Sequence, residues 1–167
     1  MVWILAALAL LAAVGFLFWR GAQRERLRRA VAARREEERD RARQVLAGPL
    51  HPLPEPGIPL QPGERAYYRT VASPLEPEPD GGFRRRGYGE LWVTDRAVVY
   101  RSRGGELVRT PIQEVERVDI PYLDVIALVT FRDTVTRDEV RAYYQVPEPL
   151  VLAAHVARWA GFELILE

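Results

Sequence analysis

Hydrophobic positions are distributed in three different ways along the chain, and each distribution predicts a different kind of element. Residues 2–19 are apolar without interruption, residues 20–47 are charged with sparse apolar positions, and from residue 64 onward short runs alternate between apolar and polar side chains. Between the last two stretches, residues 48–63 hold six prolines in sixteen positions. The pattern predicts, in this order, an apolar helix, a charged helix, a proline-rich linker and a mainly β domain.

The apolar run at residues 2–19 predicts a single transmembrane helix. At roughly 1.5 Å per residue it spans about 27 Å, close to the hydrocarbon thickness of about 30 Å. Trp3 and Trp19 stand near its two ends, where the membrane interface favours the indole ring. A cleaved signal peptide is the alternative, but no basic residue precedes the run, and bulky residues 16–19 stand where a peptidase requires small ones. A buried core helix seldom has this length without a polar face. We therefore expect an uncleaved anchor.

Arginines directly after the apolar run give the predicted anchor a direction. Only the α-amino group precedes the run, whereas five arginines follow it closely: Arg20, Arg24, Arg26, Arg28 and Arg29. The positive-inside rule then places the N-terminus outside and the rest of the chain at the cytoplasmic face of the cell (inner) membrane. A lone N-terminal anchor that carries the domain outward remains the alternative topology.

Residues 20–47 predict a basic helical stalk. They contain no proline and are rich in Ala, Arg and Glu, and Glu25 with Arg29 forms an i,i+4 pair with the acid first. The apolar positions are too sparse for a heptad seam over three heptads. This spacing favours a solvated helix, in part bound to lipid headgroups, over a coiled-coil dimerisation stalk.

The proline-rich residues 48–63 predict an extended, semi-rigid spacer and a domain boundary, because proline removes backbone donors and fixes φ. Such runs also serve as ligands for proline-reading domains. We favour the spacer.

Residues 64–162 predict a mainly β domain. Residues 95–96 mark a tight hairpin turn between two of its strands, and residues 103–105 mark the next turn. Residues 73–82, rich in proline and acid, are expected to form a loop after the first strand. Seven short runs of β-forming residues predict strands, at 65–72, 88–94, 97–102, 106–110, 115–120, 123–131 and 139–146. Such a meander predicts a small sandwich or barrel.

Residues 147–160 predict a helix that closes the domain. Proline stands near its start and Gly161 directly after its end. Three apolar side chains fall on one helical face and are expected to fill an open end of the barrel: Leu152, Val156 and Trp159. Residues 163–167 are then a C-terminal tail.

The order of seven strands and one helix resembles the pleckstrin-homology-like plan of bacterial PH-like (PH/GRAM-like) domains, over about residues 64–162. The local sequence is similar to that of this family at residues 89–100 (GELWVTDRAVVY) and 110–118 (TPIQEVERV). In that family an L-x-V-T-D-x-R hairpin precedes an I-P-L-x-x-I turn. Here the arginine follows the aspartate directly and the second motif is looser. Trp159 resembles the helix tryptophan that many such domains bury. The resemblance implies a seven-stranded PH-like barrel or sandwich capped by the helix.

The resemblance also indicates one candidate site. In phosphoinositide-binding members the region after the first strand supplies basic headgroup contacts, and here it holds Arg84, Arg85 and Arg86. Each arginine near an anionic membrane contributes about 1 kcal/mol to the free energy of membrane binding. Glu76, Glu78 and Asp80 lie a few residues upstream and are able to neutralise them.

Composition excludes several kinds of chemistry. The chain has no cysteine and no lysine, so thiol nucleophiles, cysteine-ligated metals, disulfides and Schiff-base lysines are excluded. His51 lies in the proline-rich segment and His155 on the last helix, and neither Ser73 nor Ser102 stands in a nucleophile motif. We expect no catalytic residue, metal or cofactor. The arginine-rich, asparagine-free usage suits a thermophile or a GC-rich genome.

Charge is divided unevenly along the chain. The net charge is +1, but residues 20–47 carry ten arginines against five acids, whereas residues 48–167 carry fourteen against eighteen. An acidic domain does not favour nucleic acid. The sequence therefore predicts a membrane-anchored, non-enzymatic module that binds a protein partner or forms a homo-oligomer. A peripheral module that binds anionic lipid through residues 84–86 is the alternative, and an enzyme is the least supported class.

Overall fold

The computed structural model describes residues 2–132 and 138–166. The chain divides into two units, Met1–Glu37 and Glu38–Glu167. The first unit consists of most of helix α1 (Val2–Ala47), which runs without a break through the segments expected to form the anchor and the stalk. The expected Glu25–Arg29 pair forms, with 3.0 Å between Oε1 and Nε. Among the helical residues that the structure describes, no stretch is both long and apolar enough to cross a membrane.

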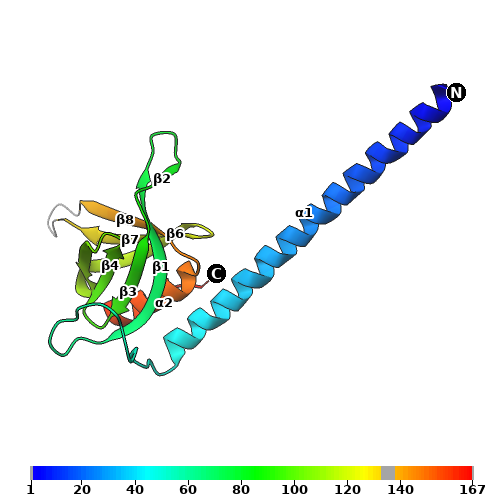
Figure 1. The fold of residues 1–167 in the computed structure, drawn as a ribbon. Helices are drawn as coiled ribbons and strands as arrows, with labels where there is room; N and C mark the ends of the chain where they lie inside the picture. Colours follow the sequence, from blue (N-terminus) through cyan, green and yellow to red (C-terminus); the bar gives the residue numbers. More distant parts are fainter. Residues whose placement is uncertain (1, 133–137, 167) are drawn as a thin grey trace. The chain divides into compact units, whose positions relative to one another are not determined.

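The second unit is built on one antiparallel sheet, shown with its helices in Figure 1. Along the sheet the strands follow the order β5-β4-β3-β1-β8-β7-β6, with β2 paired to the end of β1. The strands are β1 (Ala66–Pro77), β2 (Phe83–Arg85), β3 (Gly89–Thr94), β4 (Ala97–Ser102), β5 (Leu107–Pro111), β6 (Val115–Tyr122), β7 (Val125–Phe131) and β8 (Glu139–Gln145). Each of the seven expected strands is present within about two residues at most ends, and β2 is an additional one.

Strand β1 connects the two halves of the sheet. Its first part pairs with β3 as far as Ala72, and Ser73–Leu75 then pair with β8. The expectation of a loop at residues 73–82 is therefore wrong for residues 73–77. Proline and acid in this segment suggested a loop, but pairing with the distant β8 and with β2 satisfies its backbone.

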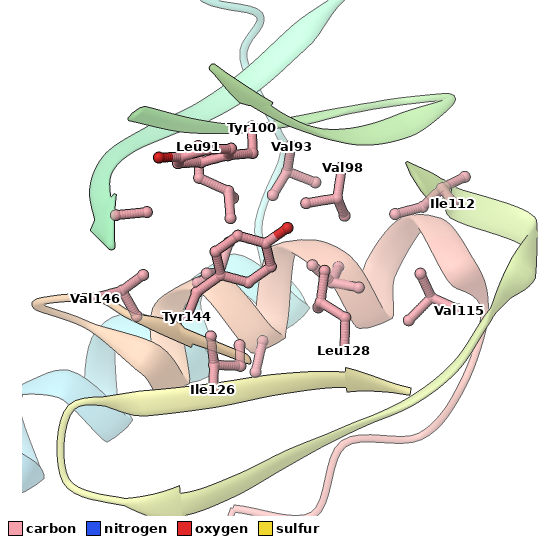
Figure 2. Close-up of a cluster of buried hydrophobic side chains, with 14 residues drawn as sticks. Leu91, Val93, Val98, Tyr100, Ile112, Val115, Ile126, Leu128, Tyr144 and Val146 are labelled. Carbon is pink, nitrogen blue, oxygen red and sulfur yellow. The ribbon is translucent and has the colours of Figure 1, made fainter. Parts of the chain in front are cut away.

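The core lies between the two halves of the sheet and helix α2 (Pro149–Ala160). Alternation in β3 and β4 sends every second side chain inward. Figure 2 shows inward side chains of these strands facing those of β7 and β8 across the interior; they include Leu91, Val93, Val98, Ile126, Leu128 and Tyr144.

Helix α2 begins at Pro149, whose missing N–H costs nothing at the first helical position. It ends at Ala160, and the following Gly161 adopts a left-handed φ of 81° and donates its N–H to the carbonyl of Ala157. A short 3₁₀ turn, η1 (Ile112–Glu114), connects β5 to β6. The result is a mainly β domain with an eight-stranded antiparallel sheet and a C-terminal helix, in agreement with the expected order of strands followed by one helix.

The last turns of α1 belong to this second unit and pack beside α2. The Glu38 carboxylate accepts the N–H of Leu150 at 2.6 Å and so caps the start of α2. At the other end, the Arg158 guanidinium donates to the carbonyls of Val45 at 2.8 Å and Leu46 at 2.5 Å, which caps the end of α1. Each helix thus satisfies free backbone groups of the other.

Candidate functional site

The candidate site is the outer face of β1, β3, β4 and β5, the side of the sheet that is turned away from the core. Because Leu91 and Val93 point inward, Glu90 and Trp92 point outward. Cross-strand register then arranges the outward residues in two rows. The first row is Arg69, Trp92, Val99 and Arg109, and the second is Val71, Glu90, Arg101 and Leu107. Tyr88 and Arg103 continue the face beyond the second row, joined by a bond from the Arg103 N–H to the Tyr88 carbonyl at 3.0 Å. We call this set of ten residues the outer face.

A proline-rich segment covers the two central residues of the first row, Trp92 and Val99. Residues 53–60, here called the proline strap, lie on Trp92 and Val99, both of which are fully buried. The Trp92 indole N–H donates to the carbonyl of Pro56 at 2.7 Å, and the N–H of Leu53 donates to the carbonyl of Ala66 at 2.7 Å. Ile58 is buried against these side chains.

Residues 53–60 of the expected semi-rigid spacer therefore pack on the domain. Leu53, Ile58 and Leu60 all pack against the outer face. The sequence does carry a signal for this cover, because β3 and β4 are apolar at successive positions rather than at alternate ones. A strand that is apolar on both faces is covered on both.

The second row is open to solvent. Val71 is 61% exposed, Leu107 is 40% exposed and the neighbouring Tyr88 is 52% exposed. Between them, the Glu90 carboxylate pairs with Arg69 and, at 2.9 Å, with Arg101. Hydrogen bonds from Arg69 hold the pKa of the Glu90 carboxyl below its usual value, against the opposing effect of burial and with the help of Arg101. The Arg69 and Arg101 guanidinium carbons also lie 5.5 and 5.0 Å from the Trp92 ring centroid.

A buried carboxylate fixes the edge of the outer face. The Arg109 Nη2 donates to both oxygens of Glu64, at 2.6 and 2.7 Å, and the Thr94 hydroxyl donates at 2.6 Å. Burial alone would raise the pKa of Glu64, but the hydrogen bonds from Thr94, the Gln61 N–H and Arg109 lower it overall. This network connects the end of the proline strap to β5.

The predicted arginine triplet is divided between two environments. Arg84 pairs with Glu76 at 2.8 Å and approaches Glu78 at 3.8 Å, and Arg86 also pairs with Glu76. The hydrogen bond from Arg84 lowers the pKa of Glu76. The acids upstream of the triplet thus contact two of its three members.

Arg85 has a different partner. Its Nη1 donates to the Tyr88 hydroxyl at 3.0 Å, and its guanidinium lies 5.8 Å from the ring centroid. The Arg103 guanidinium lies 5.6 Å from the same ring. Among the described residues, no carboxylate lies within ion-pair distance of Arg85 or Arg103. Sequence reasoning missed Tyr88 and Arg103, because only the β3–β4 pairing brings Arg103 next to Tyr88.

The remaining predicted residues lie elsewhere. The arginines after the apolar run are exposed on α1: Arg20, Arg24, Arg26, Arg28 and Arg29. Leu152 and Val156 are fully buried in the core, and Trp159 packs against it with its ring 4.7 Å from that of Tyr67.

Within the described part of the chain, the two histidines form no catalytic arrangement. His51 is exposed ahead of the proline strap, whereas His155 is buried and stacks on Tyr68 at 4.7 Å. Ser73 is buried in β1, and the Ser102 hydroxyl accepts the Glu106 N–H at 3.1 Å within a turn. Residues 2–132 and 138–166 contain no group of three or more histidine and acidic side chains placed to hold a metal ion.

Comparisons with known proteins identify no family. No family model matches the chain, and no curated protein matches it. Among solved structures, the chain is similar to the crystal structure of the Ran binding domain from the nuclear complex component Nup2 of Ashbya gossypii. The two are 20% identical, the match covers 59% of this chain and 96% of that one, and the TM-score is 0.47. At this level the likeness carries no argument about function.

Proposed function

We propose that this chain is a membrane-tethered, non-enzymatic module that binds another protein through the exposed part of the outer face. The observation that carries this proposal is the group of exposed apolar side chains, Val71, Tyr88 and Leu107, set among paired arginines on the sheet. Tyrosine and arginine are enriched at the energetic centres of protein interfaces.

Pre-ordering of the arginines supports the proposal. Ion pairs with Glu90 and contacts with Trp92 hold Arg69 and Arg101 in place. A partner that binds them therefore loses less side-chain entropy than it would on a flexible surface. A non-enzymatic role is supported by the structural partners of His155 and Ser102.

The membrane tether in this proposal rests on the sequence of residues 2–19 and on the arginines that follow them. With those arginines on the inner side, the proposed tether has the domain at the cytoplasmic face of the cell membrane. A chain anchored in this way needs no lipid recognition by its domain to stay at the membrane, which leaves the outer face available for a protein. A second copy of this chain is one candidate for that protein.

Photocrosslinking tests the proposal. With a benzoylphenylalanine residue at position 107 in the intact chain, we expect a discrete protein adduct in membranes of the source cell. The matched control places the same residue at position 140, since Val140 on β8 is exposed to a similar extent, 38% against 40%. Equal adduct yields at the two positions, or none at either, would count against the outer face as the binding surface.

Anionic-lipid binding is the second candidate, favoured by the absence of acidic partners for Arg85 and Arg103 within the described part of the chain. Its test uses the full chain in phosphatidylcholine vesicles, with and without phosphatidylserine. If the domain contacts anionic lipid, amide hydrogen exchange around Tyr88 must be slower with phosphatidylserine in the vesicles than without it. That protection must disappear in Arg85→Gln/Arg103→Gln and persist in Arg84→Gln, because Arg84 is paired with Glu76.

A further inference from the structure

The proline strap occupies part of the outer face in the manner of a bound peptide, and this identifies a chemistry for the partner. We propose that the outer face is a binding site for an extended, proline-rich segment of a partner protein, which takes the place of the proline strap. The inference rests on the proposed protein-binding function and specifies the kind of partner.

Recognition of the strap uses groups that every proline-rich segment carries. Proline has no N–H but retains its carbonyl. A protein therefore recognises such a segment mainly by donating hydrogen bonds to its backbone carbonyls. Here the Trp92 indole N–H donates to the carbonyl of Pro56, and the Arg101 Nη1 donates to that of Gly57 at 2.6 Å. Aromatic-lined surfaces recurrently bind extended proline-rich peptides, and here the Trp92 ring lies under the strap.

Only a few apolar side chains hold the strap on the outer face. Ile58 is its one buried residue, and Leu53 and Leu60 pack beside it. The intervening Pro54, Glu55 and Pro59 are exposed. The strap adds no strand to the sheet, and its own residues form no helix or strand. A separate segment with the same spacing of apolar residues is able to make every one of these contacts.

The strap covers only part of the surface suited to such a ligand. Val71 and Leu107 lie in the adjacent row and remain exposed. Arg101 belongs to that open row and also donates to the strap, so it joins the covered and open parts. A longer proline-rich segment would bury both rows, which gives it an advantage over the strap that offsets the lower effective concentration of a ligand in trans.

A peptide of the chain's own sequence serves as the probe. Fluorescein-labelled LHPLPEPGIPLQP, residues 50–62, is titrated into the full-length chain in detergent micelles. Leu53→Ser/Ile58→Ser in the chain weakens the strap, and Pro54→Ser/Pro59→Ser, at exposed positions, is the matched control. We expect the peptide to bind the weakened chain at least about tenfold more tightly than the control chain, because the competing strap has lost its apolar contacts. A peptide carrying the same two serine substitutions as the weakened chain should not bind.

A second measurement uses a milder substitution and decides the matter if the weakened chain fails to fold. In Ile58→Ala, whose strap has lost its one buried side chain, an excess of spin-labelled peptide is expected to broaden the NMR signal of the Trp92 indole N–H. Absence of broadening, or equal binding to the weakened and control chains, overturns the inference.

Two further results are diagnostic. A dimer of the unmodified chain that is lost in Leu53→Ser/Ile58→Ser would mean that the occupant is the strap of a second copy, and the separate partner would be rejected. If no peptide binds although the protein adduct at position 107 forms, the proposed function stands and only the proline-rich partner is rejected.

Discussion

At the scale of single residues, burial and pairing determine which charges are available to a ligand. His155 lies on α2 in a buried position, stacked on Tyr68, and its Nδ1 has no hydrogen-bond partner within the described residues. Burial, with a smaller effect from the positive Arg158, lowers its pKa to about 4. The folded state therefore resists protonation of this ring. The stability of the domain then depends on pH through a residue of α2 that is not part of the outer face.

We predict that stability falls as the pH drops from about 6.5 to about 4. In this window the unfolded state binds a proton at His155 and the folded state does not, so the free energy of unfolding decreases. The lowered pKa corresponds to a decrease of roughly 3 kcal/mol at most in that free energy. Above pH 6.5 both states are neutral at this residue and the contribution is constant. Urea unfolding of the full chain across this range measures the effect.

The variants are His155→Phe, which keeps a ring against Tyr68 but cannot titrate, and His51→Gln, which removes the exposed histidine. The first should flatten the dependence on pH and the second should leave it unchanged. The same slope in His155→Phe and in the unmodified chain would show that another group is responsible.

Residue-level reasoning also explains how far the candidate site was predictable. Three consecutive arginines suggest one cluster, but alternate residues of a strand point to opposite faces. Arg84 is opposite Glu76 in the register of β1 and β2, and Arg86 shares that acid, whereas Arg85 contacts Tyr88. The partner Arg103 is far away in sequence, so no local pattern indicates it.

At the scale of elements, local alternation was sufficient to predict seven strands and the closing helix, because periodicity and turn residues are local properties. It was insufficient wherever a distant partner decides the conformation. Pairing with β8 keeps residues 73–77 in β1, and Trp92 with Val99 holds a proline-rich segment that has no regular structure of its own.

We predict that Ile58→Ala lowers the free energy of unfolding by about 2 kcal/mol, because it removes a buried side chain that covers Trp92. Pro59→Ala, at an exposed position of the same strap, should change it by less than about 0.5 kcal/mol. Chemical unfolding of both full-length variants provides the comparison. Equal effects at the two positions would show that the strap contributes little to the domain.

At the scale of the whole molecule, the function we propose separates attachment from recognition. The sequence of residues 2–19 predicts attachment and is followed by concentrated positive charge, whereas residues 48–167 are acidic on balance. An acidic domain gains little from an anionic membrane, and two arginines of the triplet, Arg84 and Arg86, are paired with Glu76. Apolar residues on the outer face, partly covered by the chain's own proline strap, fit a protein ligand better than a lipid surface.

The most direct measurement of this account is partner recovery with an altered outer face. Val71→Asp/Leu107→Asp places two carboxylates among the exposed apolar residues of the second row, and Val140→Asp is the matched control on β8. Each full-length chain is crosslinked in membranes of the source cell and purified. We predict that the double variant recovers at least about tenfold less partner than the control, since burial of unpaired charge costs more than 1.4 kcal/mol. Equal recovery, with both chains folded, would contradict the assignment of the outer face as the protein-binding site.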